Sequence, residues 1–181
     1  MRYYFFIICF FICYAVPAKT IHVGARHMHK TITEGLKAAE TGDTVLVEAG
    51  HYKEKNLIIR KRIVLKGMDY PVLDGERKYE IISVKANGLV VDGFKLIHSG
   101  ISSLEDLSGI KVYDSRDVII KNNILEDTFF GIYMQNVINC TIENNQLTGI
   151  SKEEQQSGNG IHCWKSDSLR IIANKITGHR D

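Results

Sequence analysis

The chain has little net charge and no concentrated basic stretch. Of its 181 residues, 23 are Lys or Arg and 21 are Asp or Glu, which gives a formal net charge of +2. No basic patch interleaved with aromatic residues occurs, so the electrostatic footprint of a nucleic-acid-binding protein is absent. A content of 44% hydrophobic and 24% charged residues is that of a folded protein. We therefore expect one globular domain without a nucleic-acid partner.

The sequence also has only one long apolar run, which lies at its start. Arg2 provides a positive charge, residues 3–16 are uncharged and largely apolar, and Val16-Pro17-Ala18 offers small residues for cleavage. The run is shorter than the ~20 residues that span a bilayer, and no second run follows. We expect residues 1–18 to be a cleaved signal peptide and the mature chain to be periplasmic or secreted. A membrane anchor is the alternative.

A repeated unit occupies the second half of the chain, in residues 109–125, 131–147 and 160–176. In each unit an isoleucine follows a glycine, and the second apolar segment begins eight residues later. The pairs are Ile110 and Val118, Ile132 and Cys140, and Ile161 and Leu169. Successive units start 22 and 29 residues apart, and the extra seven residues fall in the polar stretch 151–157, as expected for a surface loop. A degraded earlier unit spans residues 82–96, and a longer insertion follows it at 97–108.

The segments within each unit alternate apolar and polar residues, which predicts short strands with one buried face. One coil of about 22 residues cannot bury that face alone, whereas stacked coils form a continuous core. The sequence therefore predicts an all-β fold, a right-handed parallel β-helix. Asn123, Asn145 and Asn174 share one position at a bend, where we expect a structural ladder of stacked amides.

The cysteines are few, and two of them, Cys9 and Cys13, lie within the predicted signal peptide. Export permits a disulfide between the remaining Cys140 and Cys163, but they occupy different positions of their coils. We therefore expect both to act as small buried hydrophobes. Cys163 and Met134 occupy the inward position of Val112, which predicts that they belong to the core.

The N-terminal part predicts a cap for the stack. Residues 31–34 have the spacing of a helix capping box, and Gly42 follows as a stop. We predict an N-terminal segment with a capping helix at 19–42 and β-helix coils at 43–181. Strands are expected at 43–47 and within 57–65, with turns at Ala49-Gly50 and Lys66-Gly67. The repeat stops where another coil is due, so we expect a C-terminally truncated β-helix.

Several motifs of the first coils resemble the NosD family. They are Gly42–Val47, Gly50-His51-Tyr52, Leu65-Lys66-Gly67 and Val72–Gly75, together with the later Asn-Asn repeats and the closing Gly178–Asp181. These coils are similar to carbohydrate-binding and sugar-hydrolase-type β-helix repeats. The resemblance implies a periplasmic accessory scaffold that works beside an ABC transporter in maturing the copper centre of nitrous oxide reductase. It implies no catalytic motif, and polysaccharide lyases and epimerases use similar coils.

A copper role needs imidazole or sulfur ligands. The best local cluster is His27-Met28-His29, to which His22 could add a ligand. The alternative is that this cluster arises by chance, since seven histidines are not exceptional in a chain of this length.

When the repeated units are stacked, their outward-facing residues form rows across the coils. The residue types in these rows indicate whether a catalytic or a sugar-binding site is present. The rows are Lys111, Tyr133 and His162; Tyr113, Gln135 and Trp164; Ile119, Thr141 and Arg170; Lys121, Glu143 and Ile172; and Glu126, Thr148 and Thr177. No row has the two carboxylates that sugar cleavage uses, which favours a scaffold over an enzyme. The alternative is that acids from the loops at Glu105-Asp106 and Glu153-Glu154 contribute to a cleavage site. Tyr113, Tyr133, His162 and Trp164 offer aromatic and polar groups for carbohydrate binding. The alternative is that the aromatic residues pack beneath an inserted loop.

Overall fold

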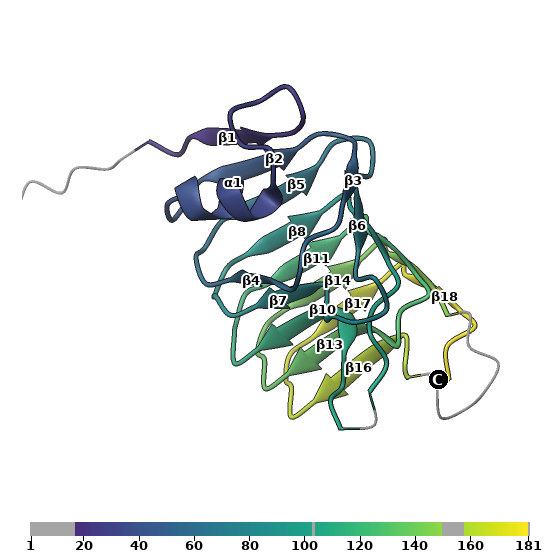
Figure 1. The fold of residues 1–181 in the computed structure, drawn as a ribbon. Coiled ribbons are helices and arrows are strands. Elements are labelled where there is room, and N and C mark those ends of the chain that lie inside the picture. Colours follow the sequence, from purple (N-terminus) through teal and green to yellow (C-terminus); the bar gives the residue numbers. More distant parts are fainter. Residues whose placement is uncertain (1–16, 103, 150–157, 181) are drawn as a thin grey trace, which may run out of the picture.

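The computed structural model describes residues 17–102, 104–149 and 158–180, which form a stack of coils with three parallel sheets (Figure 1). The sheets have seven, five and six strands in the described part. Sheet A contains β1 (Thr20–Val23), β2 (Thr44–Val47), β5 (Val64–Gly67), β8 (Val90–Asp92), β11 (Ile119–Lys121), β14 (Thr141–Glu143) and β17 (Arg170–Ile172). Sheet B contains β3 (His51–Tyr52), β6 (Val72–Asp74), β9 (Lys95–Ile97), β12 (Ile124–Glu126), β15 (Gln146–Thr148) and β18 (Lys175–Thr177). Sheet C contains β4 (Leu57–Ile59), β7 (Ile82–Val84), β10 (Ser108–Tyr113), β13 (Phe130–Gln135) and β16 (Ile161–Trp164).

From β2 onward, each turn of the chain contributes one strand to sheet A, then one to sheet B and one to sheet C. All neighbouring strands are parallel, and the repeat alignment sets their register. Ile110 pairs with Ile132 and Ile132 with Ile161, and the outward row of Lys111, Tyr133 and His162 follows the same register. The predicted right-handed parallel β-helix is confirmed.

The core runs along the axis of the stack. Side chains at equivalent inward positions, such as Val91, Ile120 and Ile142 of sheet A, are fully buried. Full burial of one such side chain contributes about 1.5–3 kcal/mol to the free energy of unfolding.

Met134 is buried as predicted, whereas the prediction of a buried Cys163 is wrong. Cys163 is exposed because β16 is the outermost strand of sheet C in the described part, and no described coil covers it. Cys140 is buried, and both thiols are free.

The asparagine positions form a hydrogen-bonded ladder across three coils. Asn123 donates to the side-chain oxygen of Asn145 from its backbone N–H and its Nδ2, both at 3.0 Å. Asn145 donates in the same way to Asn174, at 2.9 and 3.0 Å. The preceding residues, Asn122, Asn144 and Ala173, have φ near +54°. The bend therefore uses one residue for the left-handed backbone and the next for the ladder.

Helix α1 (Ile32–Ala38) covers the first coil at the end of the stack opposite β16 (Figure 1). The predicted capping box is present, because Thr31 Oγ1 accepts from the backbone of Glu34 at 3.2 Å and Glu34 accepts from the backbone of Thr31 at 3.2 Å. Ile32 and Gly35 are buried against the stack. No helix in the described ranges is long and apolar enough to cross a membrane.

The N-terminal region differs from the sequence-based predictions in two details. Sheet A begins with β1, upstream of the helix and of the expected start of the coils at residue 43. The strands expected within 57–65 are present as β4 and the start of β5, which belong to different sheets because a basic corner at 60–62 separates them. The turn predicted at Lys66-Gly67 is wrong, because both residues belong to β5. Gly67 is needed there because any Cβ would collide with the carbonyl oxygen of Gly93 in the next coil.

Residues 1–16 of the predicted signal peptide and the loop 151–157 lie outside the described residues.

Candidate functional site

The outer surface of sheet C carries a cluster of aromatic and ionisable side chains. We call it the sheet-C face, and it consists of Glu80, Lys85, Lys111, Tyr113, Tyr133, Gln135, His162 and Trp164. Lys111, Tyr133 and His162 lie side by side on β10, β13 and β16, and Tyr113, Gln135 and Trp164 form the parallel row two residues further on. Since strands lie about 4.8 Å apart, each row spans about 10 Å.

Glu80 is the buried acid of this face and lies just before β7, with only 5% of its surface exposed. The Tyr113 hydroxyl lies 3.1 and 3.2 Å from its two carboxylate oxygens, and Ser83 Oγ also hydrogen-bonds to it. Burial raises the pKa of Glu80, and the hydrogen bonds from Ser83 and Tyr113 offset this rise only in part. Glu80 therefore keeps its proton at a higher pH than an ordinary carboxyl group.

Two ammonium groups flank the Tyr113 ring. Lys85 Nζ lies 4.5 Å from the ring centroid, and Lys111 Nζ lies 5.0 Å from it and 4.3 Å from the centroid of Tyr133. At these distances a cation is attracted to the face of an aromatic ring. Burial and the neighbouring Glu80 raise the pKa of Tyr113, so its hydroxyl stays protonated and donates to the carboxylate.

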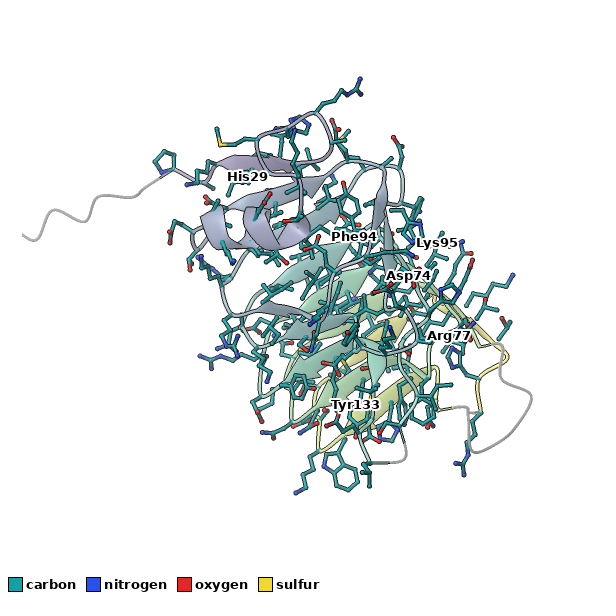
Figure 2. All side chains as sticks on the ribbon, viewed as in Figure 1. His29, Asp74, Arg77, Phe94, Lys95 and Tyr133 are labelled. Atoms are coloured by element: carbon teal, nitrogen blue, oxygen red, sulfur yellow. The ribbon has the colours of Figure 1, made fainter. Side chains whose placement is uncertain are left out.

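Tyr133 forms the floor of the face together with Lys111, since only 5% and 7% of their surfaces are exposed (Tyr133 is labelled in Figure 2). The ring of Tyr133 lies 4.6 Å from that of His162 and 5.3 Å from that of Phe130. Asp106, from the insertion after β9, lies beside Tyr133: burial and the charge of Asp106 raise the pKa of the tyrosine. Tyr133 is thus packed inside the cluster.

Trp164 differs from these packed residues because it is 52% exposed at the end of the outer row. Its neighbour across the sheet is Gln135, which is partly exposed. Lys165 Nζ lies 5.9 Å from its ring centroid. An open indole face next to an amide and an ammonium group can stack on an apolar ring face while the polar groups accept and donate hydrogen bonds.

The structure brings His22 and His27 together near the N-terminus. Their ring centroids lie 5.1 Å apart, and His27 Nε2 lies 2.7 Å from Glu48 Oε1. The hydrogen bond with His27 is the main reason why the pKa of Glu48 is lowered. Met28 is 88% exposed, and His29 (Figure 2) lines the same shallow surface hollow. Nowhere in residues 17–102, 104–149 and 158–180 do three or more His, Cys, Asp or Glu side chains form a group that could hold a metal ion.

A second ionisable cluster, which the repeat pattern does not predict, lies along sheet B near the labelled Asp74 and Arg77 (Figure 2). The buried Asp74 carboxylate contacts His51 Nε2 and His98 Nδ1, each at 3.1 Å. His98 Nε2 lies 3.9 Å from Asp127, which pairs with Arg77. Burial raises the pKa of Asp74, but hydrogen bonds from the backbone of Glu76 and from the two histidines outweigh it, so the net shift is downward. The cluster joins successive coils of the stack.

Glu80 and the Asp74 cluster could not be found from the repeats. Glu80, Asp74 and the two histidines that contact Asp74 lie in the first coils, where the repeat is degraded, and Glu80 precedes its strand instead of lying on an alternating position. The sequence did contain the two outward rows of sheet C, because these residues belong to the regular units.

No curated protein matches the chain. Among solved structures, two crystal structures of the pectin methylesterase from Aspergillus niger are similar. The deglycosylated form has 12% identity and a TM-score of 0.48, with 90% of this chain and 77% of that chain covered. The penultimately deglycosylated form has 10% identity and a TM-score of 0.47, with 90% and 87% covered. The family model described as "Right handed beta helix region" matches residues 27–176. The chain therefore belongs to the right-handed β-helix family.

Proposed function

We propose that the sheet-C face binds carbohydrate, with Trp164 as the stacking surface. The observation that supports this most is the 52% exposed indole beside Gln135, on a face whose other aromatic rings are fixed by packing. A rigid aromatic surface loses little conformational entropy on binding, and adjacent polar groups orient a ligand with hydroxyl groups.

The floor of the face supports this proposal by fixing its shape and charge. Lys111 is held between the rings of Tyr113 and Tyr133, and Tyr113 is held by Glu80. These contacts restrict the side chains before any ligand arrives, which reduces the entropy cost of binding.

We propose binding without cleavage, since hydrolysis of a glycosidic bond uses two carboxyl groups on opposite sides of that bond. Glu80 is buried beneath the Tyr113 hydroxyl, and Asp106 lies beside Tyr133. Polysaccharide cleavage is the alternative to binding alone. An assay for newly released sugar chain ends tests it directly.

The test is a screen of the purified chain against immobilised plant and bacterial polysaccharides, followed by calorimetric titration of the best binder. Replacing Trp164 by Ala removes the stacking surface and should weaken binding about tenfold, while Trp164→Phe should retain part of the affinity. Ile138→Ala is the matched control, because Ile138 is similarly exposed, at 56%, and lies outside the sheet-C face. Absence of binding to every polysaccharide, or equal affinity of Trp164→Ala, would contradict the proposal.

A NosD-like role in copper-centre maturation is the second candidate, and the pair of imidazoles at His22 and His27 favours it. Imidazole binds both oxidation states of copper, and the exposed Met28 and His29 could approach from the same hollow. An ABC transporter and nitrous oxide reductase as partners, like the periplasmic or secreted location, stay predictions. Copper titration should show binding that is lost in the His22→Ala/His27→Ala variant and retained in His51→Ala. If the natural chain binds no more copper than the double variant does, this role is excluded.

A further inference from the structure

The edge of sheet C beneath α1 has an unpaired strand. The first coil contributes β1 to sheet A and then continues into α1, so β4 is the outermost strand of sheet C on this side among the strands of the described residues. Leu57 donates its backbone N–H to Ile81 at 2.9 Å, and Ile59 accepts from Lys85 at 2.8 Å. Because a parallel strand directs the backbone groups of alternate residues to opposite sides, the N–H and C=O of Ile58 point away from β7. Neither group has a hydrogen-bond partner among the residues that the structure describes.

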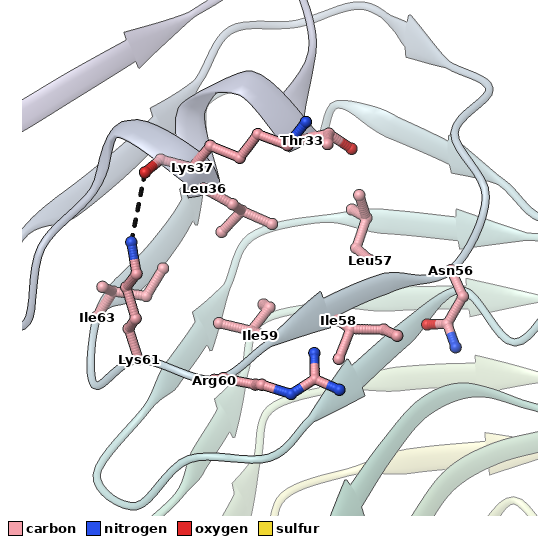
Figure 3. A pocket seen from close by; sticks show the side chains of 10 residues that line it. All are labelled: Thr33, Leu36, Lys37, Asn56, Leu57, Ile58, Ile59, Arg60, Lys61 and Ile63. Atoms are coloured by element: carbon pink, nitrogen blue, oxygen red, sulfur yellow. Dashed lines mark hydrogen bonds between the residues drawn. The ribbon is translucent and has the colours of Figure 1, made fainter.

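A groove of about 370 Å³ runs between this edge and the helix (Figure 3). Leu36 of α1 lies on one side, Leu57 and Ile59 lie on β4, and Ile63 closes one end. Ile58 is 43% exposed. The groove occupies the place where a sheet-C strand of the first coil would otherwise lie. It therefore combines an open strand edge with an apolar surface for side chains.

The charged side chains that line the groove all have one sign, whereas the acid Glu54 lies outside the lining and accepts from the backbone N–H groups of Ile32 and Thr33. Lys37, Arg60 and Lys61 line it, and no acidic side chain does. None of the three forms an ion pair within the described part of the chain. Lys61 donates to the carbonyl oxygens of Lys37 and Ala39 at the end of the helix, whereas Lys37 and Arg60 extend into solvent. A ligand with negative charges on both sides of an apolar centre complements this arrangement.

We propose that the groove binds an extended acidic segment of a partner polypeptide, which adds to sheet C as a strand next to β4. Its backbone pairs with Ile58, its apolar side chains pack against Leu36 and Ile63, and its carboxylates face Lys37 and Arg60. Addition of a strand to an open sheet edge is a common mode of peptide recognition. The lining has no aromatic side chain on which a sugar could stack, which favours a peptide over a glycan here. The site is independent of the sheet-C face proposed to bind carbohydrate.

The test uses the chain and the acetylated, amidated peptide Glu-Val-Asp-Val-Glu, with binding measured by fluorescence polarisation and by amide chemical shifts. Ile58→Pro removes the outward-pointing N–H without breaking a bond to β7, and it also replaces the Ile58 side chain and fixes φ. It should weaken binding about tenfold, while Ile58→Val, which keeps the N–H and a smaller apolar side chain, should bind normally. Far-UV circular dichroism verifies that the variants are folded. N-methylation of the central peptide amide tests the same backbone pairing from the ligand side without altering the protein.

Charge provides the second arm of the test. Lys37→Glu/Arg60→Glu should abolish binding of the acidic peptide and create binding of the analogue Lys-Val-Lys-Val-Lys, whereas Trp164→Ala should change neither. Absence of binding at millimolar peptide, or binding unaffected by both Ile58→Pro and N-methylation, overturns the proposal. Oligogalacturonate binding that depends on Arg60, without peptide binding, overturns it in favour of an anionic glycan. Self-association in sedimentation velocity that Ile58→Pro abolishes overturns it in favour of a second copy of the chain.

Discussion

The hydroxyl group of Tyr113 lies 3.1 Å from Oε1 and 3.2 Å from Oε2 of Glu80, although 33 residues separate them in the chain. The contact crosses from β10 to the residues before β7 and places a proton donor against a buried carboxyl group. Such a pair fixes the position of the tyrosine ring within the sheet-C face.

Glu80→Gln should alter how stability depends on pH. Because burial raises the pKa of Glu80 in the folded state, its contribution is fully present below its unfolded pKa and is lost as the pH rises through the folded value. Glutamine removes that loss but keeps an acceptor for Tyr113. The free energy of unfolding, measured by urea titration from about pH 4 to 8, should therefore fall more for the natural chain than for the variant. Parallel curves would show that Glu80 titrates normally.

Asn145→Ala should destabilise the stack strongly. The side chain accepts from the backbone of Asn123 and donates to Asn174 and to the carbonyl of Ile120, all within the buried ladder. Loss of these bonds leaves buried groups unpaired and should lower the free energy of unfolding by about 3 kcal/mol. Asn144→Ala is the control with a small effect, because the equivalent residue of the next coil is already Ala173. Equal losses in the two variants would contradict the ladder's role.

Asp74→Asn should flatten the acid side of the stability profile. The folded-state pKa of Asp74 is lowered, so its contribution is present above the unfolded pKa and is lost as the pH falls through the folded value. At neutral pH the free energy of unfolding of the variant should be about 2 kcal/mol lower, because the neutral amide is a weaker hydrogen-bond acceptor for the two imidazoles than the buried carboxylate. Asp69→Asn, in the exposed turn after β5, serves as the control. Thermal unfolding at several pH values measures both effects, and an unchanged acid limb in Asp74→Asn would refute the assignment.

Gly131→Ala tests how closely the coils stack. A Cβ at this position would lie 2.5 Å from Leu147 Cδ2 and would collide with the carbonyl oxygen of Gly160 in the next coil. Because backbone cannot move aside as a flexible side chain can, we expect a loss of about 3 kcal/mol in the free energy of unfolding. Thr148→Ala, at an exposed position of β15, should be nearly neutral. A stable Gly131→Ala variant would mean that the coils lie further apart.

The sequence alone determined the periodic part of this protein. Identical offsets between glycine, isoleucine and the second apolar segment predicted the coils, and the alternation of side chains predicted which residues face outward. Lys111, Tyr133 and His162 therefore lie side by side as expected. This prediction succeeds because a strand has a period of two and parallel stacking places equivalent residues next to one another.

Only the tertiary structure decided what lies outside that period. The burial of Glu80, the convergence of His51 and His98 on Asp74, and the packing of Tyr133 beneath an insertion all depend on turns of irregular length. The exposure of Cys163 depends on which coil lies next to it, and the groove at β4 depends on α1 replacing a sheet-C strand in the first coil. Local alternation carries no information about such contacts, because they join residues whose spacing is not repeated anywhere in the chain.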